Sequence, residues 1–384
     1  MRREGDRVKK VVILGGGVGG TIVANLLAKL LRPDEAEITL VDKTGKHVYQ
    51  PGFLYVAFGH TKPRSLVRDE RRLLRKRVNL VLGEAVRIDP EARKVHLADG
   101  RALEYDRLIV ALGARLVPDE LPGYAEAAHH FYTVEAAVKL RDVLARFQGG
   151  RVVVTVASVP YKCPPAPSEA ACQLDYYFAK RGIRDKVDIH FLSPLSRVFP
   201  LEPVNPVVEQ VFARHNIRST IFFNVESLDP PNRTVTSIEG ETVSYDLLVM
   251  IPPHRGAKVV EDSGLGDRGG WLPTDKYTLR TKGHPDIFGL GDCTDVPVSK
   301  SGAAAHFQAK VIADSIVADL RGESATARYD GHVMCYCDAG YHKGISMSFD
   351  YEHPPVPPPL GLKDWLGKQV LNRLYWVLVP TGRV

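Results

Sequence analysis

The chain has 384 residues, which is enough for two or three domains and for a hydrophobic core that needs no disulfide cross-links. Hydrophobic residues make up 44% and charged residues 25%, an ordinary globular composition in which the five cysteines are not a disulfide scaffold. The formal net charge of +6 excludes a strongly acidic protein; it permits an anionic membrane surface or an anionic substrate and establishes neither. No apolar stretch reaches the roughly 18 residues of a membrane-spanning helix, so the chain is expected to be soluble or to lie on a membrane.

The first part of the chain is predicted to form a strand, a helix and a second strand, at residues 11–14, 21–31 and 37–42. A basic run at 68–77 is interpreted as a solvent-facing helix. Residues 78–105 alternate and turn at Asp89-Pro90 and at Asp99-Gly100, which predicts an antiparallel meander. A buried strand at 106–113 follows.

The same order returns in the second part. A strand is predicted at 151–157, then a helix at 169–181 with Ser168 as its N-cap and Gly182 as its stop. Another strand at 187–192, a meander with turns at 229–232 and 239–240, and a strand at 246–253 complete the repeat. The repeat predicts an α/β fold of two interleaved Rossmann-like domains, and a C-terminal tail follows them.

The predicted boundaries follow from that repeat. The first domain is discontinuous and comprises residues 1–115 and 281–324, and the second domain comprises residues 116–280. The tail takes 325–384; it is aromatic, rich in proline at 354–359 and then helical.

A glycine motif opens the first domain. Gly15, Gly17 and Gly20 fit the pattern G-x-G-x-x-G between a strand and a helix, and Asp42 ends the next strand 22 residues after Gly20. Glycines let backbone N–H groups approach a pyrophosphate at the helix N-terminus, and the Asp42 carboxylate would accept hydrogen bonds from ribose hydroxyls. The alternative is a tight turn without a ligand, and the spacing disfavours it.

Two further motifs favour FAD over NAD at this site. The apolar strand at 287–292 ends in Gly291-Asp292 and precedes a helix predicted at 303–320. It resembles the second FAD motif of glutathione-reductase-like flavoproteins, in which the aspartate binds the ribityl chain. Residues Ala111 to Gly113 resemble the Ala-Thr-Gly motif of the same proteins, with Leu112 in place of threonine.

The second domain lacks its own glycine loop. The strand at 151–157 continues into residues 158–167, which contain four prolines and no glycine. Proline has no N–H donor and a fixed φ, so this loop cannot surround a pyrophosphate. We therefore predict a degenerate NAD(P)H site and an electron donor other than nicotinamide.

The cysteines leave several interpretations open. Cys163 lies in the proline-rich loop ahead of a helix, whose N-terminus favours a nearby thiolate; the alternative is an inert buried cysteine. Cys335 and Cys337 alternate along a predicted strand, so both side chains lie on one face. They could supply a redox partner for Cys163, form a metal site with His332 and His342, or pack in the core.

Several segments together resemble the sulfide:quinone oxidoreductase family over nearly the whole chain, and the cysteine loop is the most specific of them. The segments are residues 47–51, 163–167, 251–255 with 263–265, 300–302, and 335–340. The sequence also departs from the family. It has no cysteine at 121–133, so the length of a sulfur product stays open, and none near Tyr49, which favours non-covalent FAD.

The resemblance implies an enzyme that uses FAD to oxidise hydrogen sulfide to sulfane sulfur or polysulfide through a Cys163–Cys335 redox pair and passes electrons to a membrane quinone. It makes Glu169 and His254 candidate proton carriers. No metal and no nucleic acid are expected, and a homo-oligomer stays open. The candidate FAD-binding residues are Gly15, Gly17, Gly20, Asp42, Lys43, Gln50, Ala111, Gly113, Gly291, Asp292 and Lys300.

Other functions remain as alternatives. They are a type II NADH:quinone dehydrogenase, a soluble FAD-dependent disulfide or persulfide reductase, a flavocytochrome c-like sulfide dehydrogenase subunit, and a non-catalytic flavin- or metal-binding protein. The first of these needs the glycine loop that the second domain lacks.

The C-terminal segment 361–379 shows helical spacing of apolar and aromatic residues. With its lysines, arginine and tryptophans, it predicts a helix that lies in a membrane surface and places the protein peripherally at a cell membrane, on a face that stays open. The alternative is a helix docked on the protein or on a second subunit. The stripe consists of Leu362, Trp365, Leu366, Gln369, Val370, Arg373, Leu374 and Val377.

Overall fold

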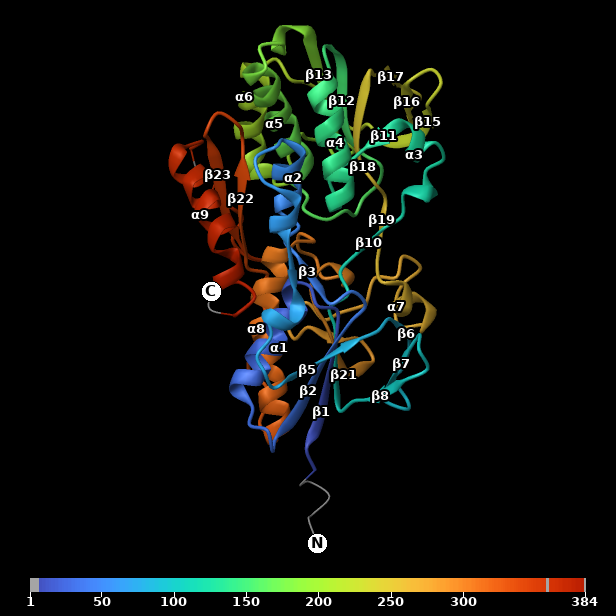
Figure 1. The fold of residues 1–384 in the computed structure, drawn as a ribbon, viewed down its shortest axis with the longest axis vertical. Helices are drawn as coiled ribbons and strands as arrows, with labels where there is room; N and C mark the ends of the chain where they lie inside the picture. The colour runs from blue at the N-terminus through green and yellow to red at the C-terminus, as the bar shows by residue number, and fades with distance from the viewer. Residues whose placement is uncertain (1–6, 357–358, 383–384) are drawn as a thin grey trace.

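The computed structural model describes residues 7–356 and 359–382. Two sheets lie one above the other, and the C-terminal hairpin and helix lie on one side, beside the upper sheet and the level between the two sheets (Figure 1). The lower sheet has six strands in the order β20, β21, β9, β1, β2, β5, all parallel except for the β20–β21 pair. Its strands are β1 (Lys9–Leu14), β2 (Ala36–Asp42), β5 (Val78–Leu82), β9 (Arg107–Val110), β20 (Arg280–Thr281) and β21 (His284–Gly289).

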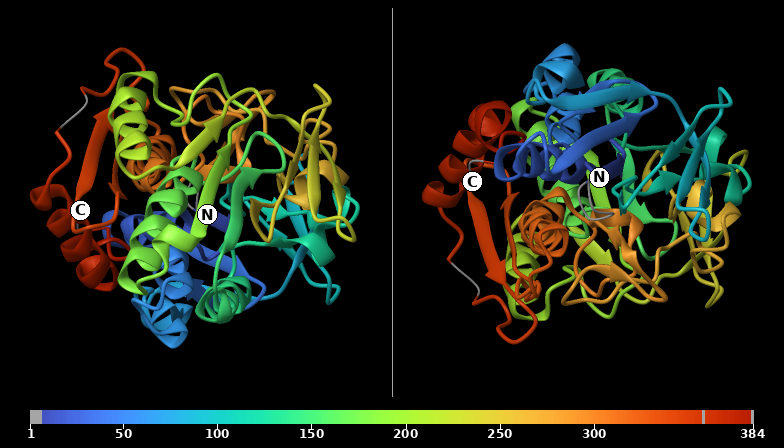
Figure 2. Two further views of the ribbon diagram at one scale, coloured as in Figure 1. Left: turned by 90° about the horizontal axis from the view of Figure 1, so that it is seen from above. Right: turned by 90° about the horizontal axis from the view of Figure 1, so that it is seen from below.

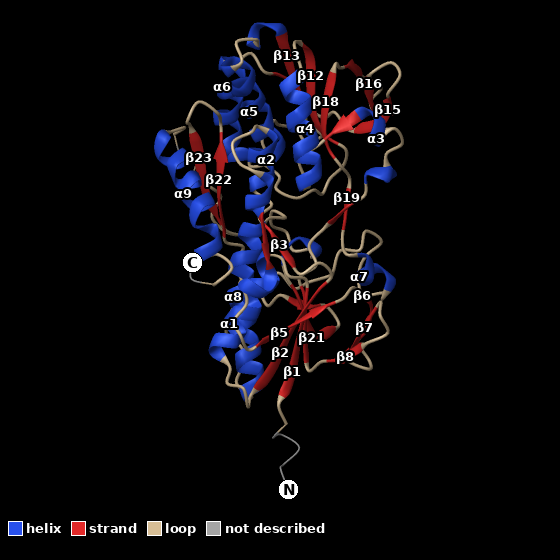
Figure 3. Ribbon diagram, in the orientation of Figure 1, coloured by secondary structure: helices blue, strands red, loops and turns tan. Residues whose placement is uncertain are grey.

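Helices α1 (Val18–Leu30) and α8 (Gly302–Arg321) pack against each other on one face of the lower sheet, and a three-stranded meander lies on the other side (Figure 3). The meander consists of β6 (Ala85–Asp89), β7 (Lys94–Leu97) and β8 (Ala102–Glu104). Residues 78–82 are not part of it, contrary to the prediction, because β5 pairs in parallel with β2. The alternation that suggested a meander also fits an edge strand of a parallel sheet.

The upper sheet has five strands in the order β11, β18, β12, β13, β14, and a second meander lies beside it. The sheet strands are β11 (Ala128–His129), β12 (Gly150–Val156), β13 (Val187–Leu192), β14 (Arg218–Thr220) and β18 (Leu247–Ile251); the meander is β15 (Val225–Asp229), β16 (Thr234–Ser237) and β17 (Thr242–Ser244). Helices α3 (Tyr124–Ala127), α4 (Val134–Arg146), α5 (Ala166–Lys180) and α6 (Asn205–Arg214) accompany these strands.

Helix α5 begins earlier than predicted. Pro165 is its N-cap residue, and the helix begins at Ala166. Pro167 lies in the first helical turn, where proline is tolerated because its missing N–H is not needed. Ser168 is therefore inside the first turn and is not the N-cap; its hydroxyl donates to the Val198 carbonyl at 2.6 Å. Gly182 follows the helix with a φ of +67°, as expected of a stop residue.

The basic run at 68–77 is not a solvent-facing helix. It forms the short strand β4 (Val67–Asp69), which pairs with β3 (Lys46–Val48), and a 3₁₀ turn, η2 (Glu70–Arg72). Glu70 is completely buried: its carboxylate accepts from Thr21 Oγ1 at 2.7 Å and contacts His47 Nδ1 at 3.1 Å. The short helix α2 (Gly52–Ala57) and the 3₁₀ turn η1 (Pro63–Leu66) lie nearby.

Two chain crossings connect the sheets, where β10 (Arg115–Leu116) pairs antiparallel with β19 (His254–Arg255). Helix α7 (Lys258–Asp262) then leads back towards the lower sheet. At the C-terminal end, β22 (Val333–Asp338) and β23 (Gly344–Phe349) form a hairpin against which α9 (Leu362–Leu378) packs. The views along the long axis place this hairpin and helix on the side opposite the two meanders (Figure 2). Of the proline-rich stretch 354–359, residues 357 and 358 lie outside the described residues.

Candidate active site

The glycine loop joins β1 to α1. Gly15 has a φ of +101°, and a Cβ there would lie 2.5 Å from the Ala111 carbonyl oxygen. A Cβ at Gly20 would lie 1.9 Å from the Gly15 carbonyl oxygen, so neither position tolerates a side chain. Gly17 is the N-cap residue, so no side chain caps the N-terminus of α1. A Cβ at Gly17 would meet no protein atom within 4 Å, so the space in front of the helix is open. The first N–H groups of α1 are thus open to an anion.

Asp42 lies at the end of β2, beside this loop. Its carboxylate accepts the N–H of Gly16 at 2.9 Å, of Thr44 at 2.8 Å and of Gly45 at 2.7 Å. Burial would raise the pKa of Asp42, but these three backbone donors outweigh it and lower the pKa. Asp42 is therefore an ionised acceptor at neutral pH. Lys43 is exposed, and its ammonium lies 3.8 Å from Glu84.

Asp292 lies in the 3₁₀ turn η6 (Gly291–Cys293), directly after β21. Its Oδ1 atom is buried and has no hydrogen-bond partner among the described residues. Burial raises the pKa of the carboxyl, while the charges of Lys162 and Lys300 oppose that rise. The Lys300 ammonium donates to the Asp292 carbonyl at 3.1 Å and lies 3.8 Å from the centre of the Trp271 ring.

The Cys163 loop lies against the same elements. The Cys163 N–H donates to the Lys300 carbonyl at 2.7 Å, and the Cys163 carbonyl accepts the N–H of Ala166 at 2.8 Å. These bonds hold Cys163 at a φ of +50°, a strained conformation for a residue other than glycine. The neighbouring Lys162 is buried and donates to Gln50 Oε1 at 3.1 Å. The fold thus brings Gln50, Lys300 and the Asp292 turn to the loop that carries Cys163.

The thiols differ in exposure: Cys163 is exposed, Cys335 is half-buried and Cys337 is buried. The Cys163 side chain reaches solvent on one side, and the dense protein on its other sides raises the pKa of the thiol to about 12. Burial also raises the pKa of Cys335 to about 12, and the charge of Cys163 contributes to that rise. Burial thus favours the neutral form of both thiols.

Glu169 and Lys368 form a buried ion pair between α5 and α9. The Lys368 ammonium donates to Glu169 Oε1, which also accepts the N–H of Asp338 at 3.0 Å. Burial raises the pKa of Glu169, although the Lys368 charge opposes it. Burial disfavours the charged form of Lys368, but Glu169 outweighs it and the pKa of Lys368 is raised. The lysine therefore stays protonated.

His254 is buried at the crossing between the sheets. Its Nδ1 donates to the Pro252 carbonyl at 2.8 Å, which leaves Nε2 as an acceptor without a partner among the described residues. Burial, together with the nearby positive charge of Lys162, lowers the pKa of His254 to about 3. The imidazole is neutral and packs edge-on against Tyr132, with ring centres 5.4 Å apart.

A family model described as pyridine nucleotide-disulphide oxidoreductase matches residues 9–309 of the chain. The chain belongs to this family. It is 26% identical to the mitochondrial sulfide:quinone oxidoreductase of Mus musculus over 90% of this chain and 79% of that protein. The X-ray structure of the sulfide:quinone oxidoreductase from Aquifex aeolicus superposes with a TM-score of 0.86 at 25% identity, covering 98% of this chain and 92% of the other. A type II NADH:quinone oxidoreductase of Staphylococcus aureus is 26% identical over 89% of this chain and 90% of its own length.

As a member of this family, the protein is a flavoprotein oxidoreductase with FAD as its cofactor. The residues present fit that cofactor. The open N-terminus of α1 suits a pyrophosphate, and ionised Asp42 has free lone pairs for ribose hydroxyls. The buried, unpartnered Oδ1 of Asp292 lacks a hydroxyl donor that a ribityl chain supplies.

Sequence reasoning missed two lysines of this site. Lys162 precedes Cys163 directly, and nothing in its local pattern indicates burial. Lys368 lies on the polar side of the C-terminal helix, the side that an amphipathic pattern assigns to solvent. The position of Lys368 opposite the apolar stripe is a usable signal of its burial. If the apolar face of the helix points outward, the helix has to dock on the protein through its polar face.

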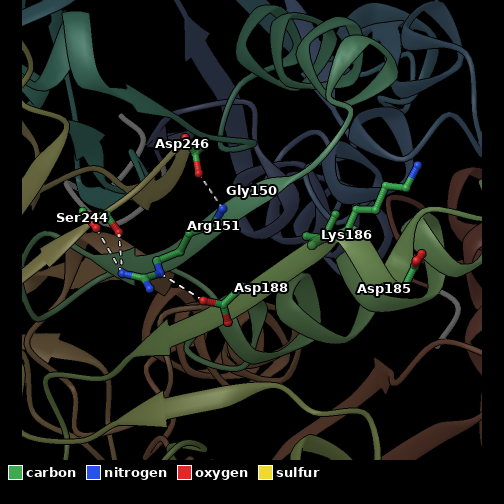
Figure 4. A pocket seen from close by; sticks show the side chains of 8 residues that line it. Gly150, Arg151, Asp185, Lys186, Asp188, Ser244 and Asp246 are labelled. Carbon is green, nitrogen blue, oxygen red and sulfur yellow. Dashed lines mark hydrogen bonds and ion pairs between the residues drawn. The ribbon is translucent and has the colours of Figure 1, made fainter.

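Away from the cysteine loop, a hollow of about 410 Å³ lies at the amino ends of β12 and β13 (Figure 4). Arg151 forms an ion pair there with Asp188 at 3.0 Å and donates its backbone N–H to Asp246. Ligands of such sheets bind at the carboxyl ends of the strands, where the Cys163 loop lies, so this hollow is not the active site. Among residues 7–356 and 359–382, no group of three or more histidine, cysteine or acidic side chains could hold a metal ion.

Proposed function

We propose that the protein is a sulfide:quinone oxidoreductase, in which Cys163 and Cys335 oxidise sulfide and FAD delivers the electrons to a membrane quinone. The names of the similar proteins support sulfide and quinone as substrates. The observation that carries the proposal is the Cys163 loop. It follows β12, where a related domain would hold a nicotinamide nucleotide, and it presents a cysteine beside the Asp292 turn instead.

The same loop argues against NADH as the electron donor. Pro164 and Pro165 supply no N–H group, and α5 has Pro165 as its N-cap residue and Pro167 in its first turn. In addition, the buried Glu169 carboxylate, which is paired with Lys368, occupies the first turn of α5. A dinucleotide pyrophosphate would therefore find no backbone N–H donors from Pro164, Pro165 and Pro167 at this end of the helix.

The sulfur chemistry begins with Cys163 and Cys335 joined as a disulfide. Hydrosulfide attacks one sulfur, a new S–S bond forms to the incoming sulfur, and the bond between the cysteines breaks. One cysteine becomes a persulfide and the other leaves as a thiolate. When the thiolate and the persulfide join as a cysteine trisulfide, a new S–S bond forms and two electrons and one proton are released. Bound FAD would supply the acceptor for the two electrons, and a quinone would take them up with two protons.

The lysines around the cysteines suit this order of reaction steps. A free Cys163 thiol with a pKa of about 12 is a poor nucleophile, so the incoming hydrosulfide has to bring the negative charge. When the cysteine leaves as a thiolate, the ammonium of Lys162 lies beside it, and the charge of Lys368 opposes the rise that burial causes in the pKa of both thiols. His254 would act on a proton only as a neutral acceptor through Nε2, because its pKa is about 3.

We propose that the Glu169–Lys368 pair serves the quinone half-reaction. It joins the helix that follows Cys163 to α9, and its carboxyl has a raised pKa that favours proton transfer. We also propose the outward face of α9 as the surface for membrane contact. Its outward side chains Leu362, Leu366, Val370, Leu374 and Val377 are 42–56% exposed, which is unusual for five apolar residues on one helix. No described helix is long and apolar enough to span a membrane.

The test is anaerobic reduction of the flavin by sulfide and by NADH, followed by absorbance. We expect rapid bleaching by sulfide, slow or no bleaching by NADH, and loss of the sulfide reaction in Cys163→Ser and Cys335→Ser. Cys337→Ser is the matched control, because Cys337 is two positions along the same strand face and buried. Fast bleaching by NADH would favour the type II NADH:quinone oxidoreductase alternative, and sulfide bleaching that survives without Cys163 would refute the mechanism.

A further inference from the structure

A groove of about 830 Å³ lies between α9 and the segments α2, η1, β4 and α5. We propose that this groove binds the headgroup of an anionic phospholipid. The inference concerns a site for lipid recognition and does not depend on sulfide oxidation. Its volume is within the range of roughly 300–1,000 Å³ typical of organic ligands and exceeds what a single inorganic anion needs.

Positive charge dominates the groove. Arg64 of η1, Arg68 of β4, Lys180 of α5 and Arg373 of α9 line it, and all four are exposed. Within the described part of the chain, none of them forms an ion pair or donates a side-chain hydrogen bond to a carboxylate. Arg68 lies 4.7 Å from the centre of the Trp376 ring and Lys180 5.5 Å from that of Tyr176, so aromatic rings hold two of the cations in place.

The groove contains one carboxylate, that of Asp338, which does not neutralise these cations. Asp338 is 4% exposed, and its Oδ1 accepts the N–H of Gly340 at 2.9 Å. The groove therefore presents four positive charges against one buried negative charge. An occupant with a phosphate diester would satisfy the guanidinium and ammonium donors from several sides.

The neighbouring surface indicates that the occupant also has an apolar part. At 100° per residue, the groove-lining Trp365, Gln369, Asn372 and Trp376 share one face of α9. The exposed apolar residues Leu362, Leu366, Val370, Leu374 and Val377 form the adjoining face, and Arg373 lies at the border between the two. A headgroup in the groove would thus extend its acyl chains along the apolar face. Tryptophan and tyrosine rings at such a border suit the interfacial layer of a membrane.

The test is calorimetric titration of the FAD-loaded protein with dihexanoyl phosphatidylglycerol below its micelle concentration. Dihexanoyl phosphatidylcholine and inorganic phosphate are the comparison ligands. We expect saturable binding of one phosphatidylglycerol and at least ten-fold weaker binding of the other two. Because each basic residue is worth roughly a five-fold gain towards an anionic lipid, glutamine at all four groove positions should weaken binding by more than 100-fold.

The matched control replaces four exposed basic residues away from the groove, Lys139, Arg146, Arg214 and Arg233, by glutamine and removes the same charge. It should bind within two-fold of the wild type, and both variants should keep the flavin bleaching of the wild type. If the four-fold groove variant does not fold, Arg64→Gln with Lys180→Gln should still lose about 25-fold in affinity. Binding of inorganic phosphate as tight as that of the lipid, or equal losses in groove and control variants, would overturn the proposal.

Discussion

Replacing Lys368 by methionine should destabilise the protein more than any substitution on the surface of α9. The Lys368 and Glu169 side chains are 9% and 6% exposed, so the substitution leaves an uncompensated carboxylate in a site with almost no water. Removing one partner of a buried pair costs about 3–5 kcal/mol. In the double variant Glu169→Gln/Lys368→Met neither member of the pair is charged, and the glutamine carbonyl can still accept the Asp338 N–H. We expect this variant to lie within about 1–2 kcal/mol of the wild type.

Urea unfolding followed by tryptophan fluorescence measures these differences. Trp365 and Trp376 lie on α9, and the protein has three tryptophans in all, so the signal also reports local release of this helix. In the lysine variant an early fluorescence change would mark release of α9 ahead of the main transition. The reasoning is refuted if Lys368→Met unfolds within about 1 kcal/mol of the wild type, or if the double variant is less stable than both single variants.

Three further predictions concern the other parts of the site. Because the folded pKa of His254 is about 3, below its ordinary 6.5, its contribution to stability is complete above pH 6.5 and decreases as the pH falls towards 3. Urea unfolding at pH 7 and pH 4.5 should therefore show that the wild type loses about 2–3 kcal/mol more than His254→Gln; equal losses would contradict the buried neutral imidazole. Asp292→Ala should weaken FAD binding about 10- to 100-fold in titrations of the apoprotein without destabilising the apoprotein, since it removes an unpaired buried oxygen. Leu366→Gln with Leu374→Gln should lower partitioning onto vesicles about ten-fold in flotation assays and leave sulfide bleaching unchanged; unchanged flotation would exclude this face as the membrane contact.

The sequence predicts the central strands β1, β2, β9, β12, β13, β18 and β21 and the helices α1, α5 and α8, because their signals are local. The apolar strand before Gly15, the strand that ends at Asp42 and the Gly291-Asp292 turn can each be recognised within a short window, and the structure places them at one end of the lower sheet. Pairing between distant strands is not local, so the sequence pattern places residues 78–82 in the meander although they pair with β2. Glu70 shows the same limit for charge. A run of basic residues surrounds it, and its partners Thr21 and His47 lie 49 and 23 positions away.

Helix α9 shows why an amphipathic pattern alone cannot assign a helix face. Its apolar stripe is visible in the sequence, but the usual inference that such a stripe packs inward does not hold here. The inward side carries Lys368 and Tyr375, each with a specific buried partner: Lys368 meets Glu169, and the Tyr375 hydroxyl lies 2.7 Å from His47 Nε2. Polar contacts of this kind orient a helix uniquely, because each one fits in a single register, whereas apolar contacts tolerate sliding. Because α9 docks through polar groups, its apolar stripe stays exposed beside the basic groove. The same docking contact, between Lys368 and Glu169, connects α9 to the helix that follows Cys163.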